Sequence, residues 1–246
     1  MPRAVAISPH LDDAAFSCGG VLARLARLGW EVVVCTTFTA SVAAPRGFAL
    51  ACQTDKGLGP EVDYMALRRA EDATACAALG ATPLWLPFAE APHRGYGDAR
   101  ALFAPSLPAD DVAAELERAL AEGPLAAMPD LVLAPQAIGG HVDHVQVVEA
   151  LSPLLRADTP CLWWTDWPYA ARPGSHPARP FGVRFDALPE RTLRGDAQAR
   201  RSACASYASQ LGFQFGGIAG LDAMLAAAGP EEAFRVEGAC PAELLN

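Results

Sequence analysis

Short apolar runs alternate with longer amphipathic segments along this chain, and this alternation constrains the fold more than any other feature. An apolar run of strand length is typical of a strand buried on both faces of a parallel sheet, and the segments between the runs have helical period. The order predicts an α/β fold: one Rossmann-like domain over residues 1–246, with a mostly parallel sheet and helices on both faces. The expected strands are 4–8, 31–37, 83–87, 130–134 and 161–165, and the expected helices are 19–28, 65–79, 110–121 and 144–155.

Three segments lack periodicity and are predicted to be loops: 40–63, 92–109 and 172–181. The first contains Gly and Pro and is long enough to cover one edge of the sheet. Right-handed crossovers place the carboxyl ends of parallel strands along one edge, where ligands of such folds bind. Polar residues that directly follow the strands are therefore the first candidates for a functional site.

The charge balance limits the expected partners. The formal net charge is −9, so nucleic acid and anionic membrane surfaces should repel the molecule, and a small neutral or polar substrate fits better. The seven cysteines are odd in number and show no CxxC spacing, which predicts reduced thiols. The N-terminal residues do not resemble a signal peptide, and no stretch is apolar for long enough to span a bilayer. We therefore expect a cytoplasmic protein without a membrane partner.

The first polar cluster, residues 8–13 (SPHLDD), follows the first predicted strand. In the turn after a strand, His10 and Asp13 can come close enough to bind one metal ion. Asp12 would then point elsewhere and be free to take a proton from a metal-bound water. The alternative is that Asp12 and Asp13 only cap the helix that follows.

The second polar cluster, residues 139–144 (GGHVDH), follows the fourth predicted strand. Its histidines, His141 and His144, are three residues apart and would lie on one face of a helical turn. A catalytic zinc site usually has three protein ligands and keeps one position for water. Three ligands are reached with His10, Asp13 and one of the two histidines of this cluster. If His144 is the ligand, His141 is left to stay protonated and to stabilise an oxyanion or protonate a leaving amine, while Asp143 orients a histidine. The alternatives are a helix N-terminus with solvated histidines and a purely structural metal site.

Together the two clusters resemble the motifs of the PIG-L or LmbE-like family of zinc-dependent N-deacetylases. Residues 9–13 are similar to the family's A/P-H-x-D-D-E motif, and residues 141–144 are similar to its H-x-D-H motif. Weaker similarities extend the resemblance over most of the chain; they lie at 68–71, 166–169 and 207–210.

The resemblance implies a hydrolase that removes the N-acetyl group from a small amino-sugar or related conjugate. It implies a bound Zn²⁺, with Fe²⁺ as the second choice, and no organic cofactor. The expected partner is this small N-acetylated molecule, and the oligomeric state stays open. Ala14 stands where the family often has Glu, from which we expect a changed rate or substrate preference and no loss of the metal. The implied roles are metal ligand for His10, Asp13 and His144, general base for Asp12, electrostatic or acid catalyst for His141, tuning of a histidine for Asp143, and substrate contact for Arg68.

Two other functions fit the same sequence. An amidase of the same family, acting on a thiol conjugate, would use the same metal site. A non-catalytic α/β module that binds a sugar would need no metal and would be indifferent to the loss of His144.

Side chains near the expected site leave further alternatives open. Glu90 and Arg94 could line a pocket, although a solvated loop pair is preferred. His93 and His176 lie in polar loops and are expected on the surface. Core packing explains the first two members of an aromatic group at least as well as a stacking wall for a sugar ring. This group consists of Trp163, Trp164, Trp167 and Tyr169.

Overall fold

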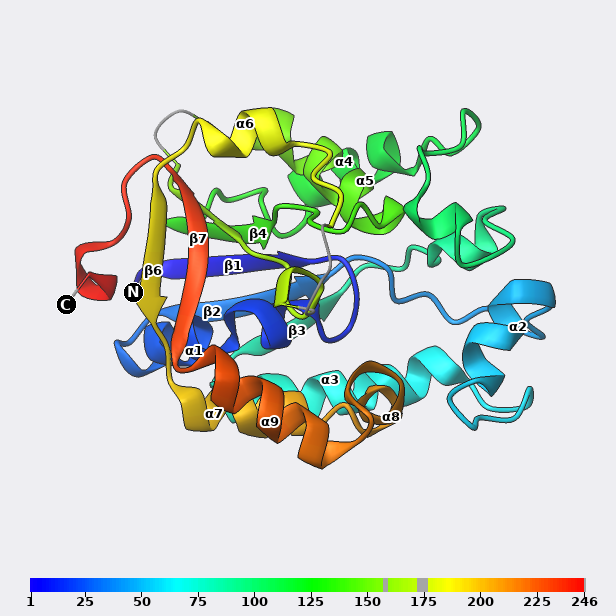
Figure 1. Cartoon of the computed structure of the whole chain (residues 1–246). Helices are drawn as coiled ribbons and strands as arrows, with labels where there is room; N and C mark the ends of the chain where they lie inside the picture. The colour runs from blue at the N-terminus through cyan, green and yellow to red at the C-terminus, as the bar shows by residue number, and fades with distance from the viewer. Residues whose placement is uncertain (157–158, 172–176, 246) are drawn as a thin grey trace.

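One sheet forms the centre of the protein. The computed structural model describes residues 1–156, 159–171 and 177–245. Within them the sheet consists of β1 (Arg3–Ser8), β2 (Glu31–Thr36), β3 (Thr82–Trp85), β4 (Leu131–Pro135), β5 (Cys161–Trp164), β6 (Glu190–Arg194) and β7 (Glu231–Glu237). Its strand order is β3-β2-β1-β4-β5-β7-β6; neighbours from β3 to β5 are parallel, and β7 is antiparallel to β5 and β6 (Figure 1). The expected mostly parallel sheet and all five expected strands are confirmed.

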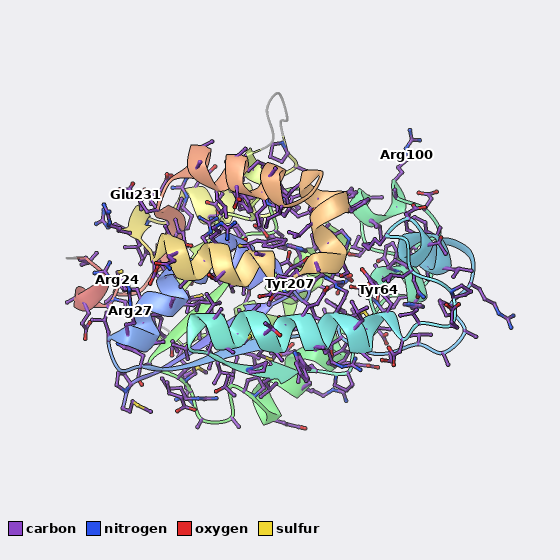
Figure 2. All side chains as sticks on the ribbon, turned by 90° about the horizontal axis from the view of Figure 1, so that it is seen from below. Arg24, Arg27, Tyr64, Arg100, Tyr207 and Glu231 are labelled. Atoms are coloured by element: carbon purple, nitrogen blue, oxygen red, sulfur yellow. The ribbon has the colours of Figure 1, made fainter. Side chains whose placement is uncertain are left out.

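Helices cover both faces of the sheet, as expected. They are α1 (Asp13–Arg27), α2 (Gly47–Thr54), α3 (Tyr64–Leu79), α4 (Val112–Glu122), α5 (Val142–Leu151), α6 (Gly182–Asp186), α7 (Ala197–Ala205), α8 (Ala208–Phe215) and α9 (Ile218–Ala228). Helices α4, α5 and α6 lie on one face, and α1, α3, α7 and α9 lie on the other (Figure 1). Seen from below, α3 runs beside α7 (Figure 2).

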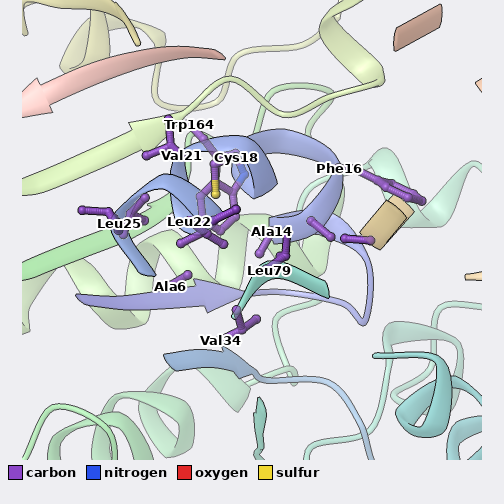
Figure 3. Packing of buried hydrophobic residues seen from close by; sticks show 14 of the residues in the cluster. Ala6, Ala14, Phe16, Cys18, Val21, Leu22, Leu25, Val34, Leu79 and Trp164 are labelled. Carbon is purple, nitrogen blue, oxygen red and sulfur yellow. The ribbon is translucent and has the colours of Figure 1, made fainter. Parts of the chain in front are cut away.

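Successive side chains of each strand point to opposite faces of the sheet, so the same strands contribute to the apolar layer on each face. On the α1 face, Ala6 of β1 and Val34 of β2 are buried with Leu22 of α1 and Leu79 of α3 (Figure 3). The intervening residues, such as Ile7, are buried against α4 and α5 on the opposite face. Strands buried on both faces read as continuous apolar runs, which is why the sequence reveals them.

Helix α1 begins at Asp13, six residues before the expected start at position 19. The helix is bent at Cys18, whose φ of −142° and ψ of 18° are not helical, so the periodic pattern describes only the second half. Glu232 accepts hydrogen bonds from the N–H groups of Gly20 and Val21, and Arg200 donates to the carbonyl of Phe16. The bend thus leaves N–H and carbonyl groups without partners inside the helix, and two buried side chains, Glu232 and Arg200, form hydrogen bonds with them.

The differences from the sequence expectations lie at the surface and near the C-terminus. Helix α2 occupies part of the expected loop 40–63, and residues 92–109 contain only short 3₁₀ turns. Strands β6 and β7 were not expected, because charged residues interrupt their apolar positions. Of the expected loop 172–181, residues 172–176, including His176, lie outside the described residues.

In the described part of the chain, no single helix has the length and apolar composition needed to span a bilayer. Helices α8 and α9, bent by 69° at their junction, meet those two criteria only when taken together.

Candidate metal centre

The carboxyl ends of β1, β4 and β5 meet at one edge of the sheet, and polar residues follow each of them. The chain continues from β1 to β2 on one side and returns as β4 on the other, and such a reversal of strand order leaves a crevice that binds ligands. Residues 10–13 follow β1, residues 141–144 lie at the start of α5 after β4, and Asp166 follows β5. The two clusters predicted from sequence are brought together here.

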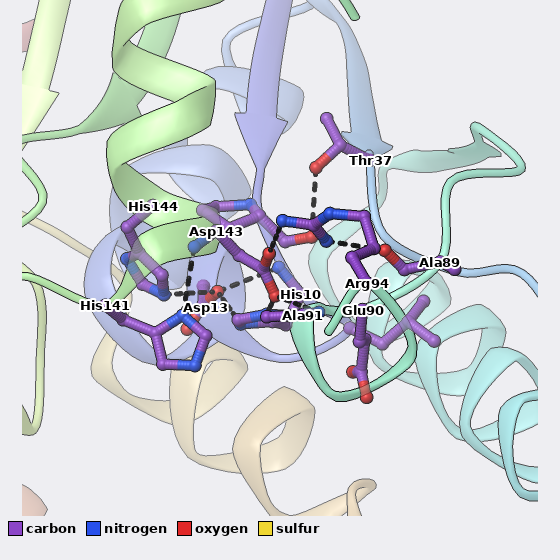
Figure 4. A network of polar contacts seen from close by, with 12 residues as sticks. His10, Asp13, Thr37, Ala89, Glu90, Ala91, Arg94, His141, Asp143 and His144 are labelled. Atoms are coloured by element: carbon purple, nitrogen blue, oxygen red, sulfur yellow. Dashed lines mark hydrogen bonds and ion pairs between the residues drawn. The ribbon is translucent and has the colours of Figure 1, made fainter. Parts of the chain in front are cut away.

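Three side chains of these clusters present ligand atoms to a common point (Figure 4). Asp13 Oδ2 lies 3.2 Å from His10 Nδ1 and 3.2 Å from His144 Nε2. All three ligand atoms lie within 4.8 Å of one another, and His144 Nε2 is buried without a hydrogen bond. An orphaned ring nitrogen beside a carboxylate and a second histidine fits a divalent metal ion, because this ligand set leaves a position for water.

Charges within this group stabilise one another. Burial opposes ionisation of Asp13, but His144 and His10 outweigh it and hold the pKa of Asp13 well below its ordinary value. Burial also disfavours charged imidazoles, yet Asp13 and Asp143 raise the pKa of His10, and Asp13 and Asp166 raise the pKa of His144 to about 9. Protons therefore compete with a metal for the two histidines.

Each of the two histidines has a carboxylate on its other ring nitrogen. His10 Nε2 lies 2.9 Å from Asp143 Oδ2, and His144 Nδ1 lies 2.8 Å from Asp166 Oδ1. Such partners fix the tautomer and orientation of a metal-binding imidazole. Asp166 is itself held, because its Oδ2 accepts from the N–H groups of Gln136 and Ile138. Asp166 was not among the site residues expected from the sequence, although it follows β5 and belongs to the weak family similarity at 166–169.

Asp166→Asn should weaken metal binding by about 10- to 100-fold, the usual cost of losing an outer partner of a metal-binding histidine. The amide can still contact His144 but no longer balances its charge. Metal affinity is measured by competition with a chelator. Asp72→Asn is the matched control, because Asp72 is a buried carboxylate that accepts from Trp85 and Tyr207 away from the metal centre. Equal affinities of Asp166→Asn and wild type would contradict this role.

Asp12 stands beside the ligand group with a strained backbone. Its φ of 148° lies in the region that favours glycine, a feature that clusters at functional sites. Its side chain makes no cap hydrogen bond, and Asp13 Oδ2 accepts from the N–H of His10, so the alternative that both aspartates only cap α1 is wrong. Arg68 Nη2 lies 3.3 Å from Asp12 Oδ2. Burial raises the pKa of Asp12 to about 7, against the opposing effect of Arg68.

His141 differs from the expectation of a protonated imidazole. Its Nδ1 accepts a hydrogen bond from the N–H of Asp143 at the start of α5, and burial lowers the pKa of His141 to about 3. A neutral ring whose Nδ1 accepts must carry its proton on Nε2. The alternative of solvated histidines is also wrong, since His141 and His144 are 9% and 1% exposed. A second group with metal-ligand spacing, His10, His141 and Asp143, shares His10 with the first.

Arg68 and two loop residues form buried ion pairs around this centre. Arg68 Nη1 donates to Glu90 Oε1 at 2.7 Å, and Nη2 donates to the carbonyl of Leu11. Arg94 Nη2 lies 2.8 Å from Asp143 Oδ1. The preference for Glu90 and Arg94 as a solvated loop pair is therefore wrong: each binds a residue of the site, and they were missed because their partners are far away in sequence.

The family model described as PIG-L: GlcNAc-PI de-N-acetylase matches residues 5–155, which include both histidine and aspartate clusters. The chain belongs to the PIG-L family. The 2'-N-acetylparomamine deacetylase of Streptomyces fradiae is 39% identical over 195 residues, which are 78% of this chain and 62% of that relative. The chain thus spans less than two thirds of the length of this relative.

Two solved structures of deacetylases are similar to this PIG-L protein along most of both chains. A deacetylase of an antimicrobial pseudoaglycone has a TM-score of 0.74 and 32% identity, covering 98% of this chain and 99% of its own. The zinc inhibited form of teicoplanin deacetylase has a TM-score of 0.72 and 26% identity, covering 95% of this chain and 97% of its own. The α/β architecture is therefore shared with solved deacetylases, and the zinc inhibited form of one of them supports a divalent metal at the His/Asp group of this chain.

An open cavity of this PIG-L protein lies over the candidate metal centre, with about 1020 Å³ of empty space that is partly open to solvent. Its polar lining includes His10, Asp12, Asp13, Arg68 and His141, and its aromatic wall consists of Phe48, Tyr64, Phe103, Tyr169 and Phe213. Core packing, the alternative to a stacking wall for Trp163 and Trp164, is confirmed: both are fully buried, Trp167 is 7% exposed in the core, and Tyr169 alone of that group lines the cavity. His93, expected on the surface, is partly buried.

Ala14, the departure from the PIG-L motif, is the second residue of α1 and is buried in the apolar layer between this helix and the sheet. Its N–H donates to Ser8 Oγ at 3.1 Å, so the backbone there is held without a carboxylate. The effect of this residue on rate or substrate preference stays a prediction.

Proposed function

We propose that this chain is a divalent-metal-dependent N-deacetylase acting on an amino-sugar conjugate. The observation that carries the proposal is the convergence of His10 Nδ1, Asp13 Oδ2 and His144 Nε2 at the base of an open cavity, in a chain of the PIG-L family. The names of its relatives support the reaction, since each of them is a deacetylase of a sugar-containing compound or of its pseudoaglycone.

His10, Asp13 and His144 would hold the metal, which we propose to be Zn²⁺, with Fe²⁺ as the alternative. A bound divalent metal supplies a Lewis acid that polarises the amide carbonyl and makes a coordinated water more acidic. One relative was solved in a zinc inhibited form, so activity should be assayed at one equivalent of metal as well as in excess.

Asp12 is the proposed general base. A general base works best when its pKa is near the working pH, and burial places the pKa of Asp12 at about 7. The pair with Arg68 keeps the carboxylate oriented in the cavity. Asp12 would take the proton of the attacking water and then give it to the amide nitrogen, so that the C–N bond breaks and the amine leaves neutral.

His141 is the proposed oxyanion donor. Because its Nδ1 accepts from the backbone, its Nε2–H is the group available to a substrate in the cavity. A neutral imidazole donating to the developing oxyanion stabilises the transition state without a formal charge. This assignment replaces the acid role that a protonated His141 would have played.

The substrate class follows from the lining of the cavity. Phe103 and Phe213 are 47% and 64% exposed at its wall, and exposed aromatic rings of this kind stack on sugar or aromatic faces. Arg68 is proposed as the substrate contact on the polar side. A small N-acetylated sugar conjugate, encountered in the cytoplasm, is the proposed partner.

The proposal is tested by acetate release from N-acetylated amino sugars, with 2'-N-acetylparomamine and a teicoplanin-type N-acetylglucosaminyl conjugate as first substrates. Metal-free protein should be inactive and should recover activity with one equivalent of Zn²⁺, Co²⁺ or Fe²⁺. Cleavage of a thiol-conjugate amide at a higher kcat/KM would favour the amidase function. Binding of the sugars without acetate release, in protein that holds metal, would overturn the deacetylase.

Metal affinity should rise with pH. The pKa of His10 is raised, and the pKa of His144 is raised to about 9, so below that pH a metal must displace protons from these rings. Affinity should fall about tenfold per pH unit for each proton released as the pH is lowered. The slope of metal affinity against pH is measured by competition with a chelator at a series of pH values between about 6 and 8. In this range His144 of the metal-free protein keeps its proton. A flat profile would contradict the raised pKa values.

A further inference from the structure

Arg94 is a largely buried cation that does not line the cavity. It contacts Asp143, the carboxylate that holds the outer ring nitrogen of His10. Its guanidinium lies 4.8 Å from the centre of the Phe38 ring, and it is not among the residues that line the cavity. Its polar contacts are with protein groups, so its effect on the site is expected through these partners.

Four contacts fix Arg94 in one orientation. Its Nε and Nη2 bind the two carboxylate oxygens of Asp110 at 3.1 and 3.0 Å, and Nη1 donates to the carbonyl of Ala89 at 2.7 Å. The same Nη2 lies 2.8 Å from Asp143 Oδ1. A planar guanidinium can satisfy these partners together, whereas an ammonium group cannot.

Asp143 transmits this orientation to the metal centre. It is fully buried, its Oδ2 accepts from the N–H of Ala91 at 3.1 Å, and the same oxygen holds His10 Nε2 at 2.9 Å (Figure 4). A buried carboxylate needs a paired cation, and Arg94 is the cation in contact with it besides His10 itself. The orientation of His10 therefore depends on Asp143, and that of Asp143 depends on Arg94.

The same arginine anchors the loop that carries part of the cavity wall. Tyr96 OH donates to Asp110 Oδ2 and accepts from the N–H of Leu107, so residues 89–110 form one hydrogen-bonded unit around Arg94. Phe103 belongs to this segment and lines the cavity. One side chain thus connects the substrate wall to a ligand of the metal.

We infer that Arg94 is a positioning residue, which sets the geometry of His10 through Asp143 and ties the loop 89–110 to the metal centre. The inference rests on the proposed function only in taking His10 as a metal ligand. It concerns the metal geometry, so it can be tested without a substrate.

The experiment uses Co²⁺, whose visible absorption reports ligand geometry, bound to the full chain. Arg94→Met should lower Co²⁺ affinity about tenfold, the lower end of what loss of an outer partner costs, and should change the visible absorption of the bound ion. Arg94→Lys keeps the charge but cannot make all four contacts, so its affinity should fall between those of Arg94→Met and wild type.

Arg184→Met is the matched control. Arg184 also lies over an aromatic ring, 4.7 Å from the centre of Trp163, and pairs with Glu237 at 3.1 Å, but it does not line the cavity or touch the metal centre. A wild-type spectrum and affinity in Arg94→Met, or an equal loss in Arg184→Met, would overturn the inference. If Arg94→Met does not fold, wild-type affinity in Arg94→Lys would overturn it. Absence of Co²⁺ binding in the wild type would instead contradict the proposed metal site, and this inference with it.

Discussion

Asp12→Asn should lower kcat for acetate release by about 10²- to 10⁴-fold, the contribution of a positioned general base, with the metal retained. The amide keeps the size of the carboxylate and an oxygen that can face Arg68, but it cannot accept the proton. Asparagine is also tolerated better than alanine at the φ of 148° that this position requires, so the substitution tests the chemistry and not the backbone.

The pH profile separates this role from a structural one. In the wild type, kcat/KM should fall as the pH drops through the pKa of Asp12, because the protonated carboxyl is no longer a base. Burial raises this pKa to about 7 in the metal-free protein, and a bound divalent cation lowers it from there. Asp12→Asn should lack this acid limb and leave only a low, flat rate. Asp222→Asn, at an exposed pair with Arg201, is the control that should keep both rate and profile. A retained acid limb in Asp12→Asn would assign the base to another group.

His144→Ala should abolish metal binding under ordinary conditions, with a loss of affinity above the roughly 100-fold that removal of an outer partner costs. The variant removes one of three ligand atoms and leaves Asp13 and Asp166 without their shared partner. Acetate release should fall to background. Elemental analysis of wild type and variant, purified without chelator, gives the metal content per chain.

His93→Ala is the control for this ligand, because His93 is partly buried but belongs to neither group with metal-ligand spacing. It should keep one metal per chain and wild-type activity. Circular dichroism shows whether His144→Ala folds. A folded His144→Ala with full metal content and activity would refute the assignment, and indifference of sugar binding to both metal and His144 would favour the sugar-binding module.

The apolar runs were sufficient to predict β1, β2, β4 and β5, because strands buried on both faces carry apolar side chains along their central positions. The edge strand β3 is only partly buried, and its short apolar run was enough to predict it as well. Strands β6 and β7 could not be predicted in this way. In β7 only alternate residues such as Phe234 and Val236 are buried, and β6 is mostly exposed, so neither is a continuous apolar run. The place of β7 between β5 and β6, and of β6 at the edge of the sheet, depends on pairing between distant segments.

The two polar clusters could also be predicted to meet, because parallel strands with right-handed crossovers end at the same edge. That rule needs only the order of strands and the positions of His10 and His144 after two of them. It does not say which carboxylate binds which histidine. The pairing of His144 with Asp166 joins the end of β5 to α5, and no local pattern contains it.

The sequence by itself thus determined the parallel α/β core and the residue types that gather at its carboxyl edge, because hydrophobic periodicity and motif spacing are local properties of the chain. Tertiary structure alone decided the bend of α1 at Cys18, the neutral form of His141, and the buried pairs of Arg68 and Arg94. It also decided that phenylalanines and tyrosines, and not Trp163 or Trp164, form the aromatic wall of the cavity. Each of these features depends on burial or on contact between segments far apart in sequence, which only the packing of the whole chain fixes.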